Sequence, residues 1–131
     1  MGNVSYSAVM LDKESHDKLV KVFKPMIPND WKVFAHHMTI KMGALPDDSK
    51  AKEDMLSGIV ITLNVEDYAM DDMVMAVGVS GYESQNAKSH ITIATNINAG
   101  AKPVMSNKLT DWKPLGFPLE LTGKVTEIEF K

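Results

Sequence analysis

One four-residue pattern occurs twice in this chain, as His37-Met38-Thr39-Ile40 and as His90-Ile91-Thr92-Ile93. Each copy lies in a run rich in apolar and β-branched residues, which predicts a β-strand. Because side chains alternate along a strand, the His and Thr of each copy share one face and the two apolar residues share the other. The repeat therefore predicts two strands that each bury an apolar face and present a polar pair on the opposite side.

The rest of the sequence predicts more strand than helix. Apolar residues at helical spacing predict a helix over residues 13–24, capped by Asp12 and ended by Pro25. Strands are predicted over residues 4–11, 31–42, 58–65, 73–80, 88–95 and 119–130. We expect a bulge near the paired histidines, a hairpin joining 58–65 to 73–80, and a short helix near 106–110 within the Gly/Pro/Asn-rich stretch 96–114.

Size and composition favour one globular domain spanning residues 1–131, of the α+β class. The chain has 131 residues, of which 44% are hydrophobic, and the sequence offers no linker that would divide it. It lacks a run of apolar residues long enough for a membrane span and the basic, apolar start of a secretory signal. Cys is absent, which suits a reducing compartment. We therefore expect a cytoplasmic protein without a membrane partner.

The charged residues limit the kind of ligand that we expect this chain to bind. The 14 basic residues are all lysine, so the bidentate guanidinium that commonly recognises phosphates and bases is missing from the chain. Residues 47–72 hold eight acidic residues and two lysines, and this segment is predicted to be a solvated connection. Long nucleic acid would find no continuous basic track here. A small nucleotide, or the terminal nucleotide of an RNA, remains a suitable partner.

The duplicated polar pair suits phosphodiester cleavage. That reaction removes a proton from the attacking oxygen and delivers another to the departing one, and imidazole does both near neutral pH. We predict His37 and His90 as the catalytic pair, with the hydroxyls of Thr39 and Thr92 holding the phosphate. For a single copy of the motif, a half-buried His bonded to a neighbouring hydroxyl explains the residues more simply. The duplication favours catalysis.

Several other residues are candidates to contact substrate. Lys41 would continue the first polar face and Lys88 precedes the second motif, so both can offset phosphate charge, although a solvated strand-end lysine explains either equally well. Tyr6 and Tyr82 are our preferred residues to stack on a base. His36 is predicted to point away from the face of His37, as a structural residue or a gate.

Metals and nucleotide cofactors are not expected. The histidines form no His-x-His or His-x-x-x-His pair that would anchor a metal, and His16 is predicted to serve the surface or the core. The chain also lacks a P-loop and a dinucleotide-binding fingerprint. We therefore predict a site without metal or cofactor.

The two His-x-Thr motifs, each followed by an apolar residue and separated by about half a small domain, resemble the signature of the two-histidine (2H) phosphoesterases. The resemblance implies a two-lobed, pseudo-two-fold domain in which antiparallel sheets flank a central cleft, with no metal. Residues 100–107 resemble the corresponding loop of the Swiss-army-knife branch of this superfamily, which is associated with RNA-end repair. The order of predicted elements from Tyr6 to Phe130 fits the same plan.

The resemblance implies a metal-independent phosphodiesterase that acts on a small nucleotide substrate. Candidate substrates are cyclic oligonucleotide signals and 2′,3′-cyclic phosphates, including those at RNA ends. The alternative is a module that binds a nucleotide or an RNA end without cutting it. Spacing alone leaves open which histidine is the acid, which phosphate position the product carries and whether the chain forms oligomers.

Overall fold

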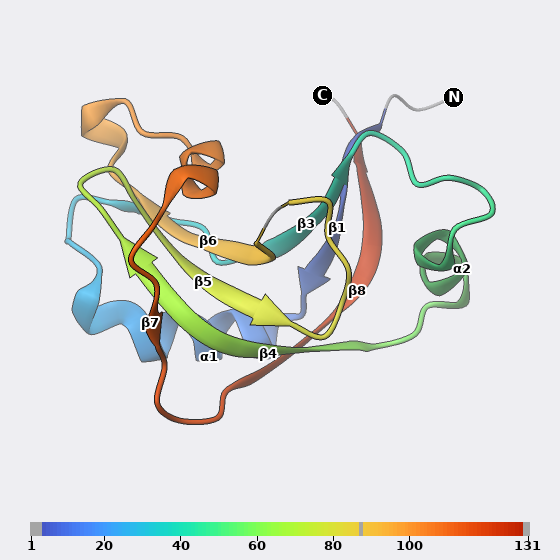
Figure 1. The fold of residues 1–131 in the computed structure, drawn as a ribbon, viewed down its shortest axis with the longest axis horizontal. Helices are drawn as coiled ribbons and strands as arrows, with labels where there is room; N and C mark the ends of the chain where they lie inside the picture. The colour runs from blue at the N-terminus through green and yellow to red at the C-terminus, as the bar shows by residue number, and fades with distance from the viewer. Residues whose placement is uncertain (1–3, 87, 130–131) are drawn as a thin grey trace.

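The fold is built on antiparallel strands with two helices outside them (Figure 1). The computed structural model describes residues 4–86 and 88–129. The long strands are β1 (Val4–Leu11), β3 (His37–Met42), β4 (Ile61–Met70), β5 (Val74–Ser80), β6 (His90–Thr95) and β8 (Glu120–Glu129). The other elements are short strands β2 (Lys32–Val33) and β7 (Lys113–Pro114), helices α1 (Lys13–Phe23) and α2 (Lys50–Ser57), and 3₁₀ turns η1 (Lys24–Met26), η2 (Ile97–Ala99) and η3 (Pro103–Lys108). The predicted α+β class is confirmed.

The strands form a sheet that closes on itself. Along it the order is β2-β6-β3-β1-β8-β4-β5, and β5 pairs in addition with β6. All of these pairings are antiparallel. The two strands that carry the His-x-Thr motifs, β3 and β6, are therefore direct neighbours. Figure 1 shows them meeting near the middle of the molecule.

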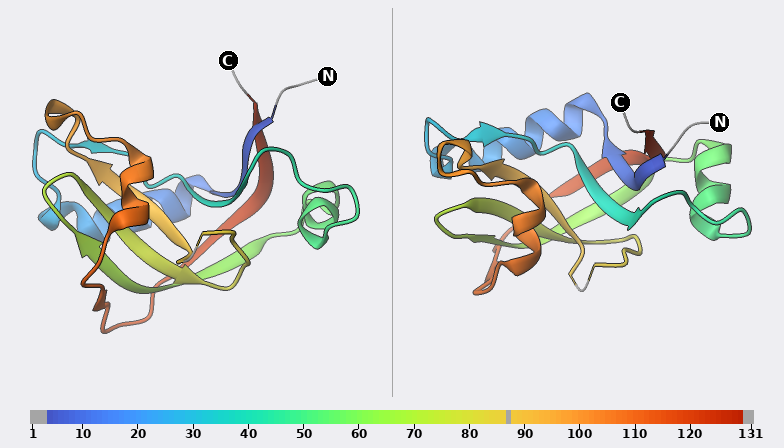
Figure 2. Two further views of the ribbon diagram at one scale, coloured as in Figure 1. Left: turned by 45° about the horizontal axis from the view of Figure 1, so that its top comes forward. Right: turned by 90° about the horizontal axis from the view of Figure 1, so that it is seen from above.

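Helix α1 forms where the spacing of apolar residues predicts it. The Asp12 side chain accepts a hydrogen bond from the backbone N–H of Ser15, which satisfies one of the free amides at the helix start. Leu19 and Phe23 are buried, and the Phe23 ring lies 5.8 Å from that of Tyr68 on β4. The two views of Figure 2 place α1 against one side of the strands, so it covers part of the core.

The predicted strand 31–42 is two strands rather than one. Ala35 lies between β2 and β3 with a φ of 55°, a left-handed conformation that ends the first strand and redirects the chain. The irregularity falls next to the paired histidines, where the sequence predicts a bulge. The irregularity changes the strand pairing more than a bulge would. Strand β2 pairs with β6, whereas β3 pairs with both β6 and β1.

Helix α2 is absent from the sequence prediction, which has a solvated connection there. Ser49 caps its start by accepting from the N–H of Lys52, and Gly58 ends it with a φ of 69°. The Lys50 ammonium lies 3.0 Å from the Asp54 carboxylate one turn along. The helix is short and carries few apolar residues, which is why hydrophobic periodicity does not show it.

The remaining predictions compare closely with the structure. The predicted hairpin is β4–β5, with β4 reaching five residues further than expected to Met70. The predicted short helix is the 3₁₀ turn η3, and the last strand is β8, whose predicted final residue, Phe130, lies outside the described residues. In place of two separate sheets the strands form one continuous sheet. No helix of the described residues is long and apolar enough to cross a membrane.

Candidate active site

The pairing of β3 with β6 brings the two motifs together. The strands are paired antiparallel through Met38 and Ile91, the residues that follow the two histidines. Antiparallel register then places His37 beside Thr92 and Thr39 beside His90. Met38 and Ile91 are fully buried in the core. The four polar side chains consequently lie on the opposite face, as the alternation of the sequence predicts.

These four side chains line one cleft of about 700 Å³. Its walls come from β1, the β2 segment, β3, the loop before β6, β6 itself and η3. Three of the four histidines of the chain line it. The lining residues are Tyr6, Met10, Lys32, Val33, Phe34, His36, His37, Thr39, Met42, Asn86, His90, Thr92, Pro103, Val104 and Asn107. Most of this lining is apolar or uncharged, so the cleft suits a compact ligand with a flat apolar part.

His90 is held in a defined orientation. Its ring is buried, and its Nδ1 lies 2.8 Å from the backbone carbonyl oxygen of Lys88. A carbonyl oxygen only accepts, so Nδ1 carries the proton and donates. The other ring nitrogen, Nε2, is thereby left for the ligand. In the neutral ring Nε2 accepts a proton, and in the charged ring it donates one.

His37 occupies a less polar environment. It is half-buried, and its ring lies 5.1 Å from the Tyr6 ring at a tilt of 31°. Burial lowers the pKa of His37 from 6.5 to about 4, and the nearby His36 and His90 add to this shift. At neutral pH the His37 ring is therefore uncharged and able to accept a proton.

The two threonines differ in their surroundings. The Thr92 hydroxyl lies 2.8 Å from the hydroxyl of buried Ser106 and donates to the carbonyl of Pro103 at 3.3 Å. To donate to a phosphate, the Thr92 hydroxyl must turn its proton away from the Pro103 carbonyl, while the Ser106 hydroxyl still donates to the Thr92 oxygen. On β3 the Thr39 backbone carbonyl accepts from the Ser84 hydroxyl, which ties the strand to the loop before β6.

Of the two lysines predicted beside the motifs, neither lines this cleft. Lys41 pairs with Ser7 and Thr39 with Ala8, so β3 has one extra residue between them. This bulge reverses the alternation, and Met42 rather than Lys41 takes the cleft face. The Lys88 ammonium instead lies 2.8 Å from Asp67 and over the Trp112 ring. The structure corrects the expectation that these two ammonium groups lie beside the histidines. The bulge turns Lys41 away from the cleft, and the ion pair with Asp67 holds Lys88.

The two predicted tyrosines are separated. Tyr6 lines the cleft and packs on His37. Tyr82 lies in another pocket, together with Lys41, and its hydroxyl donates to the buried Asp54 carboxylate at 2.6 Å. Burial and that carboxylate raise the pKa of Tyr82 well above its ordinary value. Tyr82 thus fastens the loop before β6 to α2, while Tyr6 remains in position to contact a base.

The cleft also contains residues outside the predicted site of His37, Thr39, His90, Thr92 and Tyr6. Lys32 and Phe34 line it, with the Lys32 ammonium 5.1 Å from the centre of the Phe34 ring. His36 also lines the cleft, contrary to its predicted placement, because it lies in the irregular segment between β2 and β3, where strand alternation does not apply. Its ring lies 5.3 Å from that of His16, whose Nδ1 donates to the Ala35 carbonyl. The sequence pattern does not place Lys32 at the cleft. Lys32 lies there because β2 pairs with β6.

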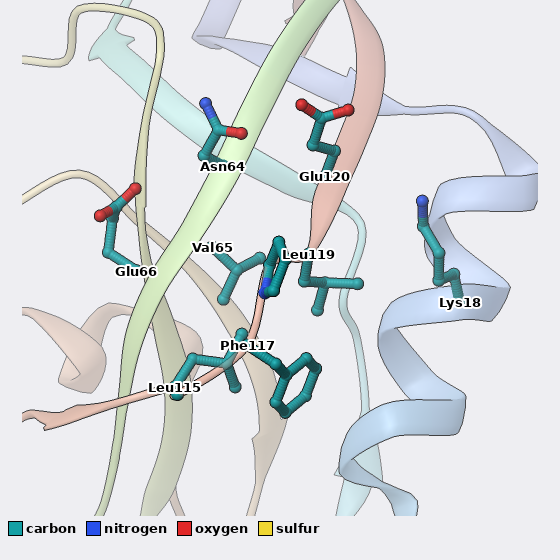
Figure 3. A pocket seen from close by; sticks show the side chains of 10 residues that line it. Lys18, Asn64, Val65, Glu66, Leu115, Phe117, Leu119 and Glu120 are labelled. Carbon is teal, nitrogen blue, oxygen red and sulfur yellow. The ribbon is translucent and has the colours of Figure 1, made fainter.

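A second depression, of about 640 Å³, lies on another part of the surface (Figure 3). Asn64, Glu66, Phe117 and Glu120 are among its lining residues. It contains no histidine and none of the residues predicted to act on substrate. The described residues hold no cluster of three or more His, Asp or Glu side chains that would bind a metal ion. The histidines predicted to act on substrate therefore lie at the cleft between β3 and β6 and not at this depression.

Paired histidines and threonines on neighbouring strands, facing a single cleft, are the arrangement of a two-histidine phosphoesterase, the family that the sequence resembles. Comparison with family models gives a match to the fungal tRNA ligase phosphodiesterase domain over residues 14–130. The chain belongs to this family, which is one of the 2H phosphoesterases, and is accordingly a phosphodiesterase. A search of curated proteins found no match.

Proposed function

We propose that the chain hydrolyses a 2′,3′-cyclic phosphate at the terminal nucleotide of an RNA, without a metal ion, using His37 and His90 as base and acid. The observation that carries this proposal is the β3–β6 pairing, which puts both His-x-Thr pairs on one face over one cleft. Membership of a tRNA ligase phosphodiesterase family supports an RNA end as the substrate.

The environments of the two rings support the division of roles. The pKa of His37 is lowered to about 4, so its ring is neutral and can accept a proton from the attacking water at physiological pH. The remaining role, general acid, then belongs to His90. Its Nδ1 donates to the Lys88 carbonyl, which directs Nε2 toward the cleft to deliver a proton.

The proposed step balances without a further reactant. Water attacks phosphorus in line with the departing ribose oxygen, and its proton passes to His37. The phosphorus–oxygen bond of the ring breaks, and His90 protonates the ribose oxygen that leaves. Thr39 and Thr92 donate to the non-bridging oxygens, where negative charge grows in the transition state.

The lining of the cleft supports a compact substrate. Lys32 is the lysine among the described lining residues, and it can attract one phosphate group. Phe34 and Tyr6 offer aromatic faces to a base. A cyclic oligonucleotide is a second candidate, because about 700 Å³ leaves room for more than one nucleotide.

We also propose that the two motifs are related by a local two-fold axis through the Met38–Ile91 pair, and that residues 1–131 act as one 2H domain. An antiparallel pair of strands carrying the same motif has this symmetry locally. The proposal predicts equivalent roles for Thr39 and Thr92 in binding the phosphate.

The proposal is tested by assaying hydrolysis in the presence of a chelator. The substrates are 2′,3′-cyclic AMP, a short RNA ending in a 2′,3′-cyclic phosphate, and a cyclic dinucleotide. We expect the RNA to be the best substrate and His37→Ala or His90→Ala to lower its turnover by roughly a hundredfold or more. Lys24→Ala, at an exposed position in η1, serves as the control. Unchanged turnover in either histidine variant would contradict the proposed roles, and activity that requires added metal would contradict metal independence.

A further inference from the structure

Behind His90 lies a charged cluster that does not line the cleft. The Lys88 ammonium is 2.8 Å from Oδ2 of Asp67 on β4 and 4.6 Å from the centre of the Trp112 ring. The other carboxylate oxygen of Asp67, Oδ1, is buried without a hydrogen-bond partner in the described part of the chain. The Asp67 charge therefore depends on Lys88.

The sheet leaves room for this cluster at one glycine. Gly78 on β5 lies between β4 and β6, since it pairs with Asp67 on one side and with His90 on the other. A Cβ at Gly78 would come within 2.0 Å of Asp67 Oδ1 and 2.7 Å of Lys88 Cε. The absence of a side chain at residue 78 thus allows Asp67 to reach across β5 to Lys88.

The cluster adjoins the backbone segment whose carbonyl contacts His90. At this end of β6 the backbone bond from Val79 N–H to the Ser89 carbonyl, at 2.9 Å, continues the pairing with β5. The next carbonyl, that of Lys88, accepts from Nδ1 of His90 instead. The Lys88 side chain is held by the ion pair with Asp67 and lies over the Trp112 ring.

We propose that Asp67 is a positioning residue for the reaction, holding Lys88 so that the Lys88 carbonyl fixes the tautomer and direction of the His90 ring. This inference builds on the proposed function, because it assigns a cause to the orientation of the general acid. Lys88 thereby acts through its backbone and its ion pair, and not by contacting the phosphate.

The test is the variant Lys88→Met, which keeps an apolar stem over Trp112 and removes the ammonium. We expect kcat for the cyclic-phosphate RNA to fall on the order of tenfold to a hundredfold with little change in KM, since the cleft lining is untouched. Lys88→Arg should retain most of the activity, because a guanidinium can still pair with Asp67. In nitrogen NMR spectra recorded at a pH at which the His90 ring is neutral, His90 should change from one tautomer, protonated on Nδ1, to a mixture.

A second variant separates positioning from stability. The double variant Asp67→Asn/Lys88→Met leaves no unpaired charge at this partly buried site, so it should recover stability while kcat remains low. Lys52→Met is the matched control, because it removes a half-buried ion pair, with Glu127 at 3.3 Å, in a part of the fold that does not line the cleft. It should lower stability and leave kcat and the His90 tautomer unchanged.

The outcomes distinguish this inference from the proposed function. If His90→Ala abolishes turnover while Lys88→Met retains wild-type kcat and a single His90 tautomer, the positioning role is wrong and the proposed function stands. If His90→Ala retains wild-type turnover, the proposed function is wrong. In that case a change of His90 tautomer in Lys88→Met would show that the ion pair orients the ring, but the role of Asp67 in the reaction would be wrong as well.

Discussion

The half-buried, neutral state of His37 should make the protein sensitive to acid. In the unfolded chain His37 takes up a proton near its ordinary pKa of 6.5, whereas in the folded protein it does so only near about 4. Between these two values the unfolded state binds more protons, so the free energy of unfolding falls as the pH falls. The perturbation that isolates this effect is His37→Gln, which keeps a polar side chain and removes the titration.

The magnitude follows from the two pKa values. At a pH below both pKa values the free energy of unfolding is lower by roughly 3 kcal/mol, and about 2 kcal/mol of this loss develops between about pH 7 and about pH 5. The wild-type protein should therefore lose about 2 kcal/mol more than His37→Gln over this range. Contributions from carboxylates such as Asp12 occur in both proteins and cancel in the difference.

The assay is urea unfolding of both proteins across this pH range, followed by circular dichroism. Above neutral pH His37 is neutral in the folded and unfolded states alike, so the difference between the proteins should become constant there. Parallel loss of stability in wild type and variant on acidification would refute the argument. It would mean that His37 titrates near its ordinary pKa in the folded protein, so the pKa would no longer support His37 rather than His90 as the base.

Further predictions concern the cleft and the core. Lys32→Met should raise KM about fivefold with kcat nearly unchanged, because an exposed ammonium contributes roughly 1 kcal/mol to binding a phosphate. Added salt should reduce this difference in KM. A KM equal to that of wild type would show that Lys32 does not contact the substrate. Leu63→Ala, at a fully buried position in β4, should cost about 2–5 kcal/mol in urea unfolding, whereas Leu56→Ala, at a position 75% exposed, should change stability by less than about 0.5 kcal/mol. Ala35→Gly should fold normally and keep activity, because glycine adopts the left-handed backbone readily. Ala35→Val should lower both the melting temperature and kcat, because a β-branched residue is strained in that conformation. Equal behaviour of the two variants would show that the turn at residue 35 does not set the strand geometry.

The polar quartet of the site could be predicted because it depends on local periodicity. Alternation along a strand puts His37 with Thr39 and His90 with Thr92, and burial of Met38 and Ile91 fixes the opposite face. Helix α1 was predictable for the same reason, from the spacing of apolar residues and a capping Asp. Such features are encoded within a few neighbouring residues.

Features that depend on register or on contacts between distant strands were not predictable in the same way. A bulge of one residue in β3 turns Lys41 out of the cleft and Met42 into it, and sequence periodicity has no means of showing an extra residue. Lys32 reaches the cleft only because Ala35 breaks the strand and β2 pairs with β6. Lys88 turns to Asp67 across β5, a contact set by the sheet order.

The most direct test of the proposed mechanism is a crystal structure of the protein with a slowly hydrolysed thiophosphate analogue of 2′,3′-cyclic AMP. We predict that a ring nitrogen of His90 lies within about 2.6–3.2 Å of the ribose oxygen that leaves, and that a ring nitrogen of His37 lies within the same range of a water molecule in line on the opposite side of the phosphorus. Binding of the analogue outside the β3–β6 cleft, or a complex in which the two rings do not lie on opposite sides of the phosphorus, would contradict the mechanism.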